Sequence, residues 1–72
     1  METLTNIVKE LRTQKDISQG KLAKLVGVTR QTIISLEKGS YIPSLLLAMR
    51  ISDTLEMPVE TIFTREVVKC KK

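Results

Sequence analysis

The chain has 72 residues and a mass of 8.1 kDa, which is enough for one small domain. Its 42% apolar and 28% charged residues are typical of a globular protein and exclude a fibrous or disordered one. No apolar run approaches the ~20 residues needed to span a bilayer, and the opening METLTNIVKEL has no signal-peptide pattern, so we expect a cytoplasmic protein without a membrane segment. One cysteine and no histidine exclude an internal disulfide, a histidine-based metal site and histidine acid–base catalysis.

The net charge of +4 is unevenly distributed along the chain. Residues 3–43 carry seven basic and three acidic side chains, whereas residues 44–66 carry two basic and four acidic ones. Three lysines add positive charge after residue 68. A basic half beside a mildly acidic half indicates one face for a polyanion and another for a different partner.

Hydrophobic spacing predicts helices along most of the chain. Leu4, Ile7, Val8 and Leu11 recur at three- and four-residue intervals, which predicts a first helix over residues 4–15. The stretch after it is divided by residues that start and end helices. A serine or threonine hydroxyl before a helix accepts a hydrogen bond from an orphan backbone N–H, and glycine ends a helix because it adopts a left-handed conformation at low cost.

These capping residues predict helices over residues 19–26, 30–38 and 45–55, preceded by Ser18, Thr29 and Ser44. The first two of these helices should end at Gly27 and Gly39. Pro58, which is tolerated in a first helical turn, predicts a short fifth helix that ends near Phe63. The expected fold is therefore all-α, a compact five-helix bundle.

The end of the chain is ambiguous in sequence. Val67 and Val68 fit either a frayed helix end or a short strand. We expect residues 1–66 to form the domain and residues 67–72 to be a short, flexible basic tail.

Two short helices joined by a tight turn lie in the segment QGKLAKLVGVTRQTIISL, residues 19–36. Ala23 is small and lets the two helices approach closely, and Gly27 permits the sharp turn. Val28, Ile33 and Leu36 are expected to hold the second of these helices against the core. The segment therefore has the layout of a helix-turn-helix.

The polar residues of the second helix of this pair remain at its N-terminal end and on its outer face. They are Thr29, Arg30, Gln31, Thr32 and Ser35. An arginine side chain can bond guanine O6 and N7 as a fork, and glutamine can do the same with adenine N6 and N7. The free N–H groups of a helix N-terminus also favour phosphate. This constellation predicts a DNA-reading helix.

The run SQGKLAKLVGVTRQTIISLEKGSYIPSL resembles the lambdoid phage repressor/Cro family of helix-turn-helix regulators, also called the Xre family. The likeness covers about residues 5–63, and it implies a five-helix fold that binds operators as symmetric dimers and regulates transcription. It implies that Gln19 bonds a phosphate and buttresses Gln31, and that Arg30, Gln31 and Ser35 face base edges. Thr29 would touch the DNA backbone or a thymine methyl.

The same resemblance implies phosphate contacts from the loop that follows the reading helix. The DNA-binding set is then Gln19, Thr29, Arg30, Gln31, Thr32, Ser35, Lys38, Ser40 and Tyr41. Arg12 and Glu37 match a partly buried salt bridge between the first and third helices of the family.

Several positions depart from the family pattern. Gly20 and Lys21 stand where acidic residues are frequent, and Ser40 stands where lysine is common. Apolar residues replace more usual polar ones at Ile34, Ile42 and Leu46. We expect these three to add an apolar surface patch, part of which faces a partner.

The function predicted from the sequence is a sequence-specific regulator of transcription, a repressor, that binds a palindromic double-stranded operator as a homodimer. The dimer contact is expected near the C-terminus, at Leu55, Met57, Ile62, Phe63 and Val67. Two alternatives remain open: a protein-interaction module, such as an antitoxin that binds its toxin on the same fold, and the detached DNA-binding domain of a larger sensor. We expect no enzymatic activity, no cofactor and no metal, and we interpret Cys70 as an idle thiol rather than a redox switch.

Overall fold

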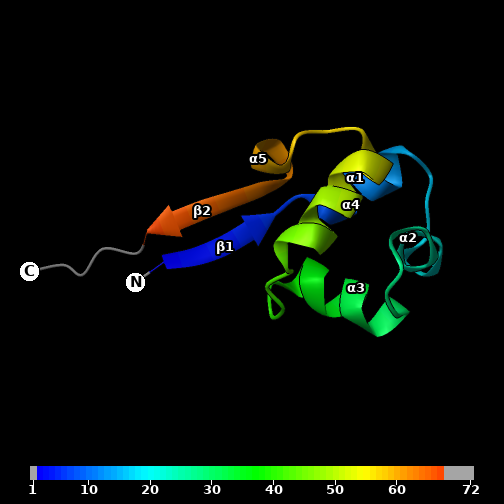
Figure 1. Cartoon of the computed structure of the whole chain (residues 1–72), viewed down its shortest axis with the longest axis horizontal. Helices are drawn as coiled ribbons and strands as arrows, with labels where there is room; N and C mark the ends of the chain where they lie inside the picture. The colour runs from blue at the N-terminus through cyan, green and yellow to red at the C-terminus, as the bar shows by residue number, and fades with distance from the viewer. Residues whose placement is uncertain (1, 68–72) are drawn as a thin grey trace, which may run out of the picture.

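The computed structural model describes residues 2–67, and the side chains of residues 4–66. Helices gather at one end of the molecule, and a two-stranded ribbon extends from them (Figure 1). The elements in chain order are β1 (Glu2–Asn6), α1 (Val8–Gln14), α2 (Gln19–Val26), α3 (Arg30–Lys38), α4 (Leu45–Leu55), α5 (Val59–Ile62) and β2 (Phe63–Val67). None of these helices is long and apolar enough to cross a membrane.

The three central helices begin where their capping residues predict, and α2 and α3 end at the predicted glycines. The hydroxyl oxygens of Ser18, Thr29 and Ser44 accept hydrogen bonds from backbone N–H groups three residues later, at 3.1, 3.3 and 3.2 Å. Gly27 and Gly39 end α2 and α3 with φ values of +82° and +83°. Because these signals are local, they can be identified without knowledge of the tertiary fold.

The hydrophobic core lies between the helices and is closed by the first residue of β2. Eight side chains are almost completely buried: Val8, Leu22, Val26, Ile33, Leu36, Ile51, Leu55 and Ile62. Ala23 is also buried, at 3% exposure, where α2 packs against α3. Leu55, Ile62 and Phe63 are thus core residues of the single chain, and the prediction that they offer apolar surface to a second chain is wrong.

The start of the chain differs from the predicted first helix. Residues 2–6 form β1, and α1 begins only at Val8. β1 pairs with β2 in antiparallel register, so that Glu2 lies opposite Val67 and Asn6 opposite Phe63. The strand partner is about 60 positions away in sequence, so a local helical periodicity could not reveal it.

The fold is therefore mostly helical, with a small sheet, and is not strictly all-α. The strand interpretation of the C-terminal segment is correct as far as Val67, and the predicted tail from residue 68 onward lies outside the described residues. Pro58 is the residue before α5 rather than its first helical residue. The Asn6 side chain makes the transition from β1 to α1, because its oxygen accepts from the Val8 N–H at 3.1 Å.

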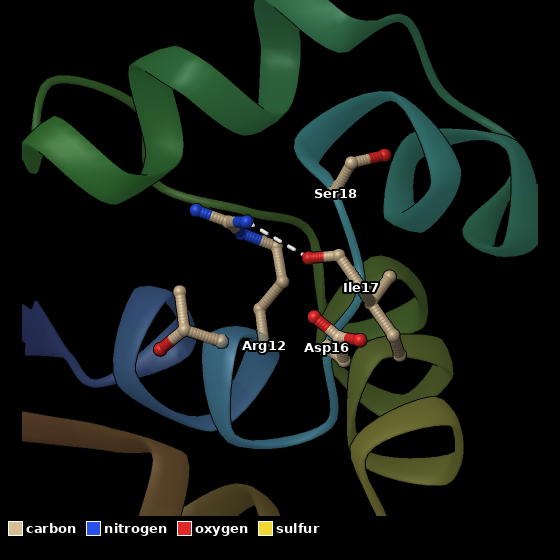
Figure 2. Close-up of a pocket in the computed structure, with 5 residues that line it drawn as sticks. Arg12, Asp16, Ile17 and Ser18 are labelled. Carbon is tan, nitrogen blue, oxygen red and sulfur yellow. Dashed lines mark hydrogen bonds between the residues drawn. The ribbon is translucent and has the colours of Figure 1, made fainter.

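The Arg12–Glu37 ion pair expected from the family resemblance is present and buried. Arg12 Nε donates to Glu37 Oε2 at 2.8 Å, and only 10% and 5% of the two side chains is exposed. The Arg12 Nη1 group donates to the Ile17 carbonyl oxygen at 2.8 Å, as Figure 2 shows. This pair joins α1 to α3 and also fixes the loop that leads into α2.

A second ion pair lies at the surface. Lys15 Nζ contacts Glu56 Oε1 at 2.8 Å and connects the end of α1 to the end of α4. The hydrogen bond from Lys15 and its positive charge lower the pKa of Glu56. Water screens this exposed pair, so its contribution to stability is small.

Replacement of Arg12 by alanine should lower the free energy of unfolding by about 3–5 kcal/mol, because it leaves the buried carboxylate of Glu37 without its cation. Urea denaturation followed by circular dichroism measures this loss. The exposed Lys15–Glu56 pair provides the control: Lys15→Ala should cost much less than Arg12→Ala, because water screens that pair. Equal losses in the two variants would show that the Arg12–Glu37 pair has no special structural importance.

Candidate nucleic-acid interface

The turn between α2 and α3 fixes the orientation of α3. The N–H groups of Gly27 and Val28 both donate to the Ala23 carbonyl oxygen, each at 2.9 Å. On the other side of the turn, Ile33 and Leu36 are fully buried. One face of α3 is therefore held against the core, and the opposite face must point outward.

The outward face of α3 carries the side chains that the sequence identifies as DNA readers. Arg30 and Gln31 are exposed, and Thr32 and Ser35 are partly exposed. Gln31 and Ser35 lie one turn apart, and the Gln31 amide donates to the Ser35 hydroxyl at 3.4 Å. Both side chains can exchange this weak contact for hydrogen bonds to a base edge or to water.

Arg30 begins α3 and pairs with no acidic side chain within the described part of the chain. Its stem lies beside α2, because a Cβ atom placed on Gly20 would be 3.9 Å from Arg30 Cδ. Gly20 is one of the departures from the family pattern, at a position where acidic residues are frequent. An acidic side chain there would lie within reach of the Arg30 guanidinium, so the glycine leaves this cation available.

The first turns of α2 and α3, both within the described residues, contain no acidic residue. The positive ends of both helix dipoles are thus not neutralised by their own side chains. The cations Lys21 and Lys24 lie exposed on α2, and Lys38 lies exposed at the end of α3. Such a combination of helix N-termini and cations attracts phosphate groups.

Gln19 is held in a different way from that implied by the family resemblance. Its Nε2 group donates to Glu37 Oε1 at 3.0 Å, and Glu37 also accepts from Arg12. The amide of Gln31 meets Ser35 instead of Gln19. The buttress expected between the two glutamines is therefore replaced by an anchor from α2 to the far end of α3.

The loop after α3 has a structural role in addition to any DNA contact. Both the N–H and the hydroxyl group of Ser40 donate to the Ser35 carbonyl oxygen, at 3.0 and 3.2 Å. This caps the C-terminal end of α3. Lys38, Ser40 and Tyr41 are all exposed, with Tyr41 at 40%.

Two contacts that support the interface were not foreseen from the sequence. The Asn6 side-chain amide donates to the Leu36 carbonyl oxygen at 3.0 Å, which ties β1 to the last turn of α3. The Arg50 Nη1 group donates to the Val26 carbonyl oxygen at 3.4 Å, at the C-terminal end of α2. Both depend on segments far apart in sequence, and no local pattern predicts them.

A depression of about 300 Å³ on the described surface is lined by Arg12, Thr13, Asp16, Ile17 and Ser18 and is shown in Figure 2. The Arg12 guanidinium that lines it is already bonded to the Ile17 carbonyl oxygen and to Glu37. The exposed face of α3 is therefore the better candidate for a functional site.

Related proteins share this arrangement. A helix-turn-helix family model matches residues 8–62, from the start of α1 to the end of α5. The uncharacterized HTH-type transcriptional regulator YgzD of Bacillus subtilis is 51% identical over 63 residues, which cover 88% of this chain and 96% of that protein. An uncharacterized HTH-type transcriptional regulator of Methanothermobacter thermautotrophicus is 52% identical over 52 residues, which cover 72% of this chain and 75% of that one.

Solved structures show the same fold. The restriction-modification controller protein C.AhdI from Aeromonas hydrophila superposes with a TM-score of 0.70 at 31% identity, over 75% of this chain and 82% of that one. The transcriptional regulator VanUg shares the fold alone, with a TM-score of 0.72 at 23% identity over 90% of this chain and 87% of that one. The chain belongs to the helix-turn-helix family of DNA-binding transcriptional regulators, of the lambda repressor/Cro (Xre) type.

Proposed function

We propose that this protein is a transcriptional repressor that binds a palindromic operator as a homodimer, with α3 in the major groove of each half-site. The observation that carries this proposal is the division of α3 into a buried apolar face and an exposed polar face that begins with Arg30 and Gln31. A helix of this kind fits the major groove, where base edges are distinguishable.

The exposed residues divide into two roles by position. Arg30, Gln31 and Ser35 face base edges, with Thr29 and Thr32 beside them in the first turn of α3. The side chains around them contact phosphates and fix the register of the helix: Gln19, Lys38, Ser40 and Tyr41. Phosphate contacts position the protein, whereas contacts to base edges provide the sequence preference.

Pairing of two chains follows from the small number of base contacts. One α3 helix of nine residues can read only a few base pairs. Two copies related by a two-fold axis read two half-sites about 34 Å apart, and the two-fold symmetry requires a palindromic operator. Repression requires only that the dimer occupies its operator, whereas activation requires a further contact with the transcription machinery.

A partner-binding role on the same fold is the second candidate, and the exposure of Ile42 and Leu46 favours it. Selection of bound duplexes from a random DNA pool distinguishes operator binding from a partner-binding role. A palindromic consensus supports the operator-binding proposal. Failure to enrich any sequence, together with purification of a defined protein partner free of DNA, would support the alternative.

Arg30→Ala should weaken binding to the selected operator by about 1–3 kcal/mol and relax the preference at one base pair per half-site, because a forked contact to guanine is lost. Fluorescence anisotropy with the consensus and its single-base variants measures both effects. Lys9→Ala, on the exposed side of α1, is the control and should leave the operator affinity and the base preference unchanged. A uniform loss on every sequence would instead assign Arg30 to a phosphate.

Lys38→Ala should weaken binding equally on all sequences and reduce the salt dependence. Each phosphate neutralised by a cation contributes about −0.9 to the slope of log K against log salt concentration. The variant should therefore have a slope shallower by about 0.9 per half-site in a titration from low to high salt. An unchanged slope would mean that Lys38 makes no phosphate contact.

Gly20→Glu should change stability and DNA affinity in opposite directions. The carboxylate lies in the first turn of α2, where it favours the helix by about 0.3–1 kcal/mol, and Gly20 is an unfavourable helix residue. The introduced carboxylate also competes with DNA for Arg30 and repels phosphate, and both effects lower the affinity for the operator. Gly20→Gln is the matched control: thermal unfolding should show a stability gain, and anisotropy should show unchanged affinity. If the Glu and Gln variants bind operator equally well, Gly20 does not keep Arg30 available.

A further inference from the structure

Apolar side chains stand exposed at the start of α4 and in the loop before it. Ile42 is 72% exposed, Leu45 72%, Leu46 61% and Met49 52%. We call these four residues the α4 apolar patch. Leu45, Leu46 and Met49 lie on neighbouring turns of the same side of α4, and Ile42 lies in the loop, three residues before the first residue of the helix.

The size of this patch is that of a functional surface. The four exposed side chains amount to roughly 500 Å², which lies within the range of about 300–600 Å² for the largest apolar patch of a monomeric protein, and such a patch is often functional. The core of the chain does not need them, because Leu47, Ala48, Ile51 and Leu55 already supply the buried face of α4. The patch therefore calls for an occupant outside the chain.

The charge of the chain restricts what this occupant is. Residues 39–49 form the longest stretch of the sequence without a charged residue, in a chain with a net charge of +4. Two copies of a basic protein repel each other wherever their charged surfaces meet, and they approach at low electrostatic cost only through an uncharged surface. DNA, in contrast, is attracted mainly by cations, and the four side chains of the patch offer none.

We propose that two copies of this chain pair through the α4 apolar patch, with the α4 helices packed against each other across a two-fold axis. This inference rests on the proposed homodimeric function and names the surface that performs it. A two-fold interface brings the same patch from both chains together, so one apolar surface suffices for both sides. The patch supplies more than half of the ~800 Å² per partner that a standard interface buries.

The position of the patch is compatible with DNA reading. The chain runs from the C-terminal end of α3 through the loop into α4, so the patch follows the end of α3 that carries Lys38 (Figure 1). Arg30 is at the opposite end of α3, about 12 Å away along the helix axis. Pairing at α4 therefore leaves Arg30 and Gln31 open to a groove.

Sedimentation equilibrium of the full chain provides the test, with the double variant Ile42→Thr/Leu46→Gln and the control Leu25→Gln. Leu25 is an exposed leucine of α2 outside the patch, at 53% exposure. We expect a wild-type dimer, a dissociation constant raised by roughly tenfold or more in the double variant, and little change in the control. Circular dichroism should show that both variants remain folded, because the replaced side chains lie outside the core.

A wild-type chain that is monomeric at tens of micromolar, or a double variant that dimerises as tightly as wild type, would overturn the proposed surface. Binding to duplexes with one and with two half-sites distinguishes a failure of the proposed pairing surface from a failure of the proposed operator binding. The double variant should bind a duplex with one half-site as tightly as wild type does. It should lose the additional affinity that wild type has for a duplex with two half-sites. A wild-type dimer that is disrupted by the double variant but enriches no DNA sequence would support the pairing surface and contradict the proposed operator binding.

Discussion

A single buried carboxylate coordinates the helices on which DNA reading depends. Glu37, near the end of α3, accepts hydrogen bonds from Arg12 of α1 and Gln19 of α2. Arg12 also holds the carbonyl oxygen of Ile17, in the loop before α2. Removal of two charges from water is costly, and only their mutual attraction with well-placed hydrogen bonds compensates it. The contacts of Glu37 thus join three helices at one buried point.

The exposed face of α3 is a consequence of this constraint. Ile33 and Leu36 are packed into the core, the turn at Gly27 sets the angle to α2, and Asn6 and Ser40 satisfy carbonyl groups near the C-terminal end of the helix. A helix held at so many points would lose little conformational freedom on the proposed binding to DNA, so more of its contact energy would be available for affinity. The rigidity of the scaffold and the exposure of Arg30 thus both favour the proposed DNA site.

Two departures from the family pattern acquire a physical meaning in the structure. Gly20 lies beside the stem of Arg30 and offers it no competing carboxylate. Ile42 and Leu46 extend an apolar surface that the core does not use. The first bears on the DNA contact proposed for Arg30, and the second bears on the proposed pairing of two chains. A relative with acidic and polar residues at these positions would share the fold and differ in both properties.

Local signals in the sequence determined the three central helices, their caps, the turn and the identity of the polar face, because each depends on residues a few positions apart. The tertiary structure alone decided the β1–β2 pairing, the Glu37 anchor of Gln19 and the burial of Leu55, Ile62 and Phe63. Leu4 and Ile7 continue the apolar spacing of α1, yet residues 2–6 pair with a strand at the other end of the chain. Backbone hydrogen bonds between distant segments leave no periodic pattern in the sequence of either segment. An apolar side chain by itself does not reveal whether it lies in the core of its own chain or faces another molecule.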